Sequence, residues 1–302
     1  MSALRALLDR TRARVLVMGV LNRTPDSFSD GGEFVDEEAA LRRVREMLAQ
    51  GADIVDVGAE STRPGAPAVA DEEQIARLGG TIAAAVALGA IVSIDTTSAG
   101  VAAHALGQGA TVVNCVDPGR AAELGALCAE HGAALVLMHC RGSMTAMAGF
   151  SAAADATYGD VVAEVARELG EAAARAMAAG LSRGEIVVDP GFGFAKNARH
   201  SLTLVAGLEA LAALGFPVLV GASRKSFVAH AAAAEEREAG GAGELAPAAE
   251  RLGGTLAIAL ACADRGARIV RAHDVAETRQ ALAVWRAVGR LGRATRGEVS
   301  GA

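Results

Sequence analysis

The chain has 302 residues, of which 52% are hydrophobic and 21% are charged, and its formal net charge is −6. This composition is typical of a globular protein with a large core and excludes a disordered or fibrous chain. The mild acidity excludes a basic surface for nucleic acid, and no apolar run reaches the roughly 18 residues of a membrane span.

Residues 1–13 have the pattern of a short amphipathic helix, and we expect them to form an N-terminal extension. Eight short apolar runs, rich in Val, Ile and Leu, follow and alternate with longer helical patterns. Runs of this kind are typical of parallel strands whose two faces are both covered. The predicted strands are 14–21, 52–58, 90–96, 110–115, 133–139, 185–191, 216–223 and 267–273.

Helical periodicity separates these runs. In the segment after the first run, Leu41, Val44 and Leu48 recur at helical spacing, and Asp36 and Gly51 are candidates for the two caps. A longer pattern at 160–180 repeats this arrangement.

Eight β-then-α units predict an α/β protein with a single (β/α)₈ barrel over residues 14–290. A doubly wound open sheet is the alternative, but no GxGxxG motif follows an early strand. Residues 231–250 look like a surface excursion, and we expect 291–302 to be a disordered tail.

Almost every predicted strand ends on a side chain that can take part in chemistry. Each could instead be structural, since an aspartate can cap the next helix and a histidine can be buried against backbone. In a barrel, however, the carboxyl ends of the strands meet at one face and carry the active site. In chain order the residues are Asn22, Asp56, Asp95, Asn114, His139, Asp189, Ser223 with Lys225, and Arg271 with His273.

One set of these residues offers mainly hydrogen-bond acceptors. Asp95, Asn114 and Asp189 suit a flat heterocycle with adjacent N–H donors, because a carboxylate accepts two such donors at once.

A second set is predicted to be cationic and suits a phosphate or diphosphate. Asn22 is an oxygen donor that could hold a Mg²⁺ ion, which keeps most of its waters and bridges to phosphate oxygens. The cationic residues are Arg63, Lys225, Arg271 and His273.

The 29 basic residues of the chain include two lysines, Lys196 and Lys225. Lysine differs from arginine where a site needs a compact ammonium group and not a planar fork of donors. Lys225 follows a strand end and is a candidate for such a site. Lys196 also follows a strand, and for it a structural position and a site contact remain open.

The segments MGVLNRTPDSFSDGG, DVGAESTRPGA, SIDT, VVDPGFGFAK, GASRKSF and RAHDV resemble the motifs of the dihydropteroate synthase family, in the same order. The resemblance spans roughly residues 15–290. It implies a (β/α)₈ barrel, usually a homodimer, and a Mg²⁺ cofactor. It further implies condensation of 6-hydroxymethyl-7,8-dihydropterin diphosphate with 4-aminobenzoate to give 7,8-dihydropteroate and diphosphate.

The resemblance also assigns roles residue by residue. The pterin-holding positions fall on Asp95, Asn114, Asp189 and Lys225. The diphosphate and metal positions fall on Asn22, Arg63, Arg271 and His273. The aminobenzoate pocket falls on Thr62, Pro64, Phe194 and Ser223. Lys225, Arg63 and the loop aspartate Asp30 are the expected catalytic residues.

The chain departs from the family pattern at Cys115, where an aspartate usually follows the asparagine. Three alternatives stay open: a pterin-binding methyltransferase, a pterin-binding paralogue without turnover, and an unrelated phosphate-binding barrel. We expect no nucleic-acid or membrane partner. The four cysteines form no CxxC pair and no signal-peptide pattern opens the chain, so we expect a cytoplasmic protein.

Overall fold

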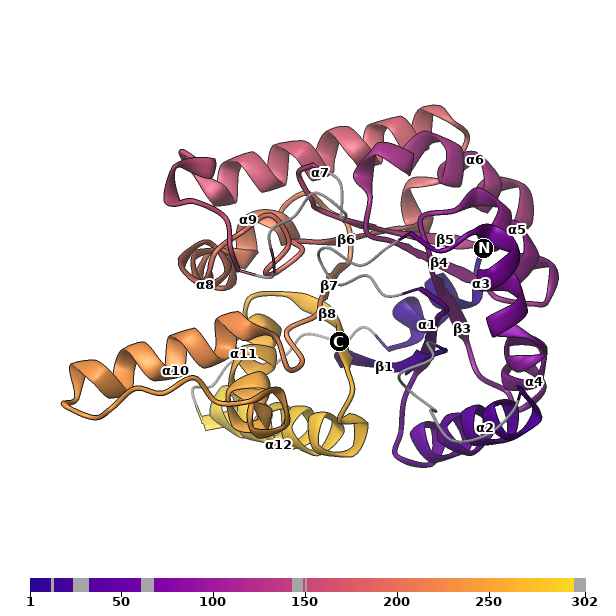
Figure 1. The fold of residues 1–302 in the computed structure, drawn as a ribbon. Coiled ribbons are helices and arrows are strands. Elements are labelled where there is room, and N and C mark those ends of the chain that lie inside the picture. The colour runs from indigo at the N-terminus through magenta and orange to yellow at the C-terminus, as the bar shows by residue number, and fades with distance from the viewer. Residues whose placement is uncertain (12–13, 24–32, 61–67, 143–148, 150, 296–302) are drawn as a thin grey trace.

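The computed structural model describes residues 1–11, 14–23, 33–60, 68–142, 149 and 151–295. Eight parallel strands pair in chain order and close into a barrel, with helices around it (Figure 1). The predicted (β/α)₈ barrel is confirmed: seven predicted strands contain the observed ones, and β1 extends one residue past the predicted end at 21. The strands are β1 Leu16–Asn22, β2 Ile54–Gly58, β3 Val92–Asp95, β4 Val112–Cys115, β5 Ala134–Met138, β6 Ile186–Asp189, β7 Val218–Val220 and β8 Ala267–Ala272.

The helices cover the outside of the barrel, except for α1. They are α1 Ala3–Arg10, α2 Glu33–Ala49, α3 Asp71–Leu78, α4 Thr81–Ala87, α5 Ala99–Gly107, α6 Ala121–His131, α7 Val161–Ala178, α8 Ala198–Ala206, α9 Leu208–Ala212, α10 Ser226–Glu238, α11 Leu252–Asp264 and α12 Val275–Thr295. Within the described part of the chain, no helix has the length and apolar character needed to cross a membrane.

Three details of the helices differ from expectation. Because α2 begins at Glu33, Asp36 lies inside this helix and is not its N-cap. The stretch expected as a surface excursion is helical up to Glu238, and α10 projects beyond the barrel in Figure 1. Its AAAAEERE sequence consists of good helix formers, which explains why the helix continues there. The last helix, α12, continues to Thr295, past the predicted barrel end at 290.

Strand alternation divides the core into an inner and an outer layer. On β2, Ile54 faces the barrel interior while Val55 and Val57 pack in the outer cluster between strands and helices. On β1, Gly19 faces outward, and a Cβ there would lie 2.7 Å from Met47 Sδ of α2. The interior therefore takes side chains from alternate strand positions, as parallel barrels require.

Helix α1 closes the lower end of the barrel, where the strands begin. Its Leu4, Leu7 and Leu8 belong to the same buried cluster as the inward side chains of the strands. Ser2 caps the helix and bonds to Glu185, and the Leu8 carbonyl accepts a hydrogen bond from Arg268 Nη2 of β8 at 3.1 Å. The packed core thus includes residues of the 1–13 segment, ahead of the predicted barrel start at residue 14.

Candidate active site

The upper end of the barrel gathers the polar side chains expected at strand ends. The register places Asn22 of β1 opposite Gly58 of β2, Gly58 opposite Asp95 of β3, and Asp95 opposite Asn114 of β4. A Cβ on Gly58 would lie 3.4 Å from the Asp95 Cβ, so the glycine leaves space above this carboxylate. Asp95 does not cap a helix, because Ser98 is the N-cap of α5.

Arg271 of β8 links two carboxylates across the barrel mouth. Its Nε donates to Asp56 Oδ2 at 2.7 Å, and its Nη2 donates to Asp95 Oδ2 at 2.8 Å. Asn114 Nδ2 also donates to Asp56 Oδ2, at 3.1 Å. The sequence predicts separate acceptor and cationic sets, but the structure joins them through this arginine. The charge of Arg271 is therefore shared with carboxylates before any anion arrives.

Two oxygens of this network keep open acceptor capacity. Among the described residues, Asp56 Oδ1 and Asp95 Oδ1 are buried without a hydrogen-bond partner. Burial raises the pKa of Asp95 to about 7, against the opposing effect of Arg271. Burial also raises the pKa of Asp189, whose Oδ1 accepts the Gly191 N–H at 2.7 Å. A ligand that donates hydrogen bonds would satisfy such oxygens and recover the cost of burying them.

Lys225 lies above the loop that follows β6. Its ammonium donates to the Phe192 carbonyl at 2.7 Å and lies 4.5 Å from the centre of the Phe194 ring. Burial lowers the pKa of Lys225 to about 8, while Asp189 opposes this shift. The Lys225 ammonium is thus a compact hydrogen-bond donor that is mostly protonated at pH 7.

His273 is neutral at pH 7, which corrects its place in the predicted cationic set. Burial and, to a smaller extent, the neighbouring Arg271 together lower its pKa to about 4. Its Nδ1 pairs with Ser223 Oγ at 2.9 Å, and Ser223 Oγ accepts the His273 backbone N–H at 3.2 Å. The pair joins the ends of β7 and β8, and the imidazole can donate a hydrogen bond without adding positive charge.

A second polar cluster lies behind the mouth. Lys196 is 0% exposed, and its Nζ donates to His139 Nδ1 at 2.9 Å. His139 Nε2 pairs with Glu168 Oε2 at 2.9 Å, and Glu168 pairs with Arg141. Burial lowers the pKa of His139 to about 3 and that of Lys196 to about 7. His139 is therefore a buried neutral histidine bonded mainly to side chains, and Lys196 is a buried lysine next to the site.

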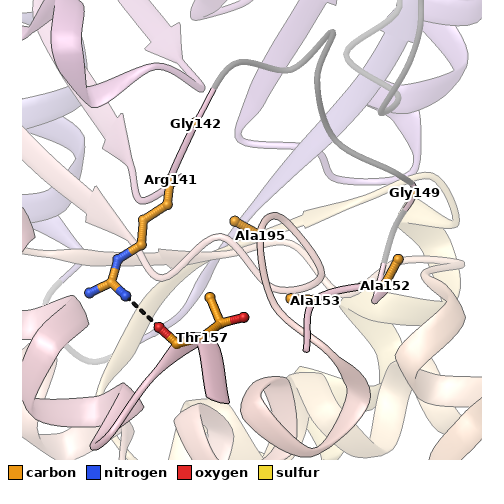
Figure 2. A pocket seen from close by; sticks show the side chains of 7 residues that line it. All are labelled: Arg141, Gly142, Gly149, Ala152, Ala153, Thr157 and Ala195. Atoms are coloured by element: carbon orange, nitrogen blue, oxygen red, sulfur yellow. Dashed lines mark hydrogen bonds between the residues drawn. The ribbon is translucent and has the colours of Figure 1, made fainter. Parts of the chain in front are cut away.

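A pocket of about 320 Å³ adjoins this second cluster (Figure 2). Arg141 borders it and donates from Nη1 to the Thr157 carbonyl at 2.8 Å. Ala195, one residue after Phe194, forms part of its wall. None of the described site residues at the mouth lines the pocket, so it lies beside the carboxylate network and not on it.

Asn22 is exposed at the end of β1, where its amide oxygen can meet a ligand. The described residues hold no cluster of three or more His, Cys, Asp or Glu side chains that could bind a metal ion. A single hard oxygen donor fits a Mg²⁺ that is held mainly by water and substrate oxygens. Four other predicted site residues, Asp30, Thr62, Arg63 and Pro64, lie outside the described residues.

Cys115 faces away from the mouth. It follows the inward Asn114 on β4 and packs in the outer cluster, with its thiol bonded to the Asp117 carbonyl at 3.2 Å. Burial raises the pKa of this thiol to about 12. The departure from the family pattern therefore lies between strand and helix, outside the carboxylate network.

Two features of the site were missing from the predicted set of functional residues. Asp56 was noted at a strand end, but its inward position, two residues after Ile54, is the signal that would have included it. Glu168 gave no such signal, because it lies on α7 among ordinary surface charges and reaches His139 only through the fold.

Comparisons with known proteins identify the family. The family described as pterin binding enzyme matches residues 18–273. A dihydropteroate synthase from Mycobacterium leprae (strain TN) is 44% identical over 273 residues, which cover 90% of this chain and 93% of that protein. The solved structure of Xanthomonas albilineans dihydropteroate synthase with 4-aminobenzoic acid is 39% identical, with a TM-score of 0.79 and coverage of 91% of this chain and 93% of the other. The Thermus thermophilus enzyme in complex with 6HMPPP is 40% identical, with a TM-score of 0.73 and coverage of 91% and 94%. This chain therefore belongs to the dihydropteroate synthase family of pterin-binding enzymes.

Proposed function

We propose that the chain condenses 6-hydroxymethyl-7,8-dihydropterin diphosphate with 4-aminobenzoate, giving 7,8-dihydropteroate and diphosphate. Solved relatives hold 4-aminobenzoic acid and 6HMPPP, which supports these two substrate classes. The observation that carries the proposal is the unpartnered Asp95 Oδ1 among the described residues, buried at the mouth opposite Asn114. A pterin edge supplies the adjacent N–H donors that this oxygen lacks.

The pterin ring would be bound by acceptors and one ammonium group. Asp95 and Asp189 would accept its N–H groups, and Asn114 would contribute its amide. Lys225 would donate to a ring acceptor while it stays over Phe194. The raised pKa of Asp95 supports this role, since its buried carboxylate gains most from a ligand that donates hydrogen bonds.

The diphosphate would lie above the cationic side of the mouth. Arg271 would neutralise charge as it develops on the leaving group, and neutral His273 would donate a hydrogen bond from Nε2 when Ser223 donates to Nδ1. Asn22 would hold the Mg²⁺ with water and diphosphate oxygens, and that ion would supply further charge neutralisation to the leaving group. The family motifs also assign Arg63 to the diphosphate and Asp30 a catalytic role.

In the reaction the C–O bond between the pterin methylene and diphosphate breaks, and a C–N bond to the arylamine forms with loss of one amine proton. Asp95 and Asp189 favour positive character on the ring, which supports early departure of diphosphate. Phe194 and Ser223, with Thr62 and Pro64, would bind the aminobenzoate. Positional isotope exchange of the bridging oxygen without aminobenzoate tests this order, and absence of exchange argues against it.

A homodimer and a cytoplasmic location complete the proposal. Val284, Val288 and Leu291 of α12 are 59%, 65% and 69% exposed, and their helical spacing gives one apolar stripe that a second copy could cover. All four cysteines are unpaired and buried, which suits a reducing compartment.

A turnover assay tests the function. Purified protein, Mg²⁺, the dihydropterin diphosphate and labelled 4-aminobenzoate should yield labelled dihydropteroate, and Lys225→Ala should abolish the product. Pterin binding without product would favour a paralogue that lacks turnover. Corrinoid methylation would favour the methyltransferase, and no pterin affinity would favour an unrelated phosphate-binding barrel.

A further inference from the structure

Phe194 lies between the two lysines of the chain. Lys225 Nζ lies 4.5 Å from the centre of its ring, and Lys196 Nζ donates to its carbonyl oxygen at 3.0 Å. The loop that carries Phe194 has an uncommon shape, because Ala195 has φ +49, in the left-handed region that disfavours residues with a Cβ. A conformation of this kind persists only where the surroundings hold it.

The Lys196 ammonium supplies that constraint. Besides the Phe194 carbonyl, Nζ donates to His139 Nδ1 at 2.9 Å and to the His139 carbonyl at 3.4 Å. Three acceptors match the three N–H groups of an ammonium, whereas the planar fork of arginine does not fit such a pyramidal arrangement. This explains why an arginine-rich chain has a lysine at this position.

His139 is itself fixed, so the constraint reaches firm structure. Its Nε2 pairs with Glu168 of α7 at 2.9 Å, and its backbone N–H donates to the Asp189 carbonyl at 2.8 Å. Lys196 therefore ties the loop after β6 to the end of β5 at a point that is fully buried. The Phe194 ring, which lies beneath Lys225, is therefore held in place by contacts that lie behind the barrel mouth.

We propose that Lys196 is a positioning residue that holds the Phe194 ring beneath the Lys225 ammonium by fixing the Phe194 carbonyl against the end of β5. Lys196 itself contacts no substrate. The expected effect of Lys196 on turnover rests on the proposed function, in which Lys225 and Phe194 bind the pterin and the aminobenzoate. Its effect on the position of Lys225 relative to the Phe194 ring is independent of that function.

The presence of two lysines makes a direct test possible. Protein labelled with ¹³C at lysine gives two sets of lysine signals, assigned by their loss in Lys196→Met and Lys225→Met. The Phe194 ring current should shift the Lys225 methylene next to Nζ upfield, and Phe194→Leu should remove this shift. Lys196→Met should also move the Lys225 signal toward that of free lysine, whereas Glu171→Gln, at an exposed position on α7, should leave it in place.

An unchanged Lys225 signal in folded Lys196→Met overturns the proposal. If the methionine variant does not fold, Lys196→Gln, which keeps a donor without the charge, takes its place in the same comparison. The signal needs no turnover, so a shifted signal in a protein that makes no product sinks the proposed function and leaves the positioning role standing.

A double-mutant cycle of Lys196→Met and Phe194→Leu, measured by steady-state kinetics, gives the second readout. Lys196→Met should raise KM for the arylamine at least about tenfold and lower kcat, and should add no further loss to Phe194→Leu, because both act through one ring. Additive losses would mean that Lys196 acts independently of Phe194, and would overturn the proposal. A change in melting temperature alone, with KM unchanged, would do the same.

Discussion

The lower and upper halves of the barrel interior use the same faces of the same strands but carry opposite chemistry. On β2 the inward residues are Ile54 below and Asp56 above, and on β4 they are Val112 below and Asn114 above. The lower half is apolar and α1 covers it. The upper half buries carboxylates around Arg271. The lower half thus contributes to stability alone, whereas the polar upper half serves binding and also depends on its buried ion pairs for stability.

Arg271→Met should have the largest effect, because it breaks the upper half. Two buried carboxylates would lose their cation, which should cost about 3–5 kcal/mol of unfolding free energy and abolish turnover. Urea denaturation and the product assay measure the two losses. Arg42→Met, which removes an exposed ion pair on α2, is the control and should cost less than about 1 kcal/mol. Full stability in Arg271→Met would contradict the network.

Leu4→Ala should break the lower half alone. This side chain is fully buried in the inner cluster, so its truncation should cost about 2–5 kcal/mol of unfolding free energy. At a temperature where the variant is folded, kcat/KM should match that of the parent. Leu88→Ala, at a position that is 39% exposed, serves as the control. A selective loss of kcat/KM in Leu4→Ala would show that the two halves are coupled.

Lys225→Arg should reduce activity at the mouth, because the shape of the cation matters there as well as its charge. A guanidinium keeps the charge but cannot place one compact donor between the Phe192 carbonyl and the Phe194 ring. We expect kcat/KM to fall roughly 10- to 100-fold, which is about 1.4–2.7 kcal/mol. The melting temperature should change little. Near-normal turnover would show that charge alone is sufficient.

Cys115→Ala should have the smallest effect, because this side chain belongs to the outer layer. Loss of one buried sulfur should cost about 1 kcal/mol of unfolding free energy and leave kcat/KM unchanged. Thermal melts and steady-state kinetics measure both. A gain of kcat in Cys115→Asp would contradict this placement, since it would require a carboxylate here to act at the mouth.

The sequence predicts the barrel and its polar mouth for a clear physical reason. Apolar runs covered on both faces read as parallel strands, and the carboxyl ends of such strands meet at one end, so Asp95, Asn114 and Asp189 can be grouped from their positions along the chain. The alternation of side chains along each strand would also have placed Asp56 inside the barrel and Cys115 outside it.

Other parts of the site depend on tertiary contacts that no local pattern encodes. The salt bridge that merges Arg271 with the acceptor set spans 176 residues to Asp95, and the neutral state of His273 follows from burial. The helix start at Glu33, ahead of Asp36, also shows how weakly a single capping residue fixes an element boundary.

Because the chain has only two lysines, reagents that modify lysine side chains have few possible targets. Apart from Lys196 and Lys225, the Lys and Arg residues of the chain are all arginines, and guanidinium groups resist acylation at neutral pH. Lys196 is fully buried. Lys225 is partly accessible, and its pKa of about 8 leaves a useful fraction as free amine. An acylating or aldehyde reagent should therefore modify Lys225 in preference to Lys196, so that a label found on a lysine side chain reports the accessible mouth of the barrel.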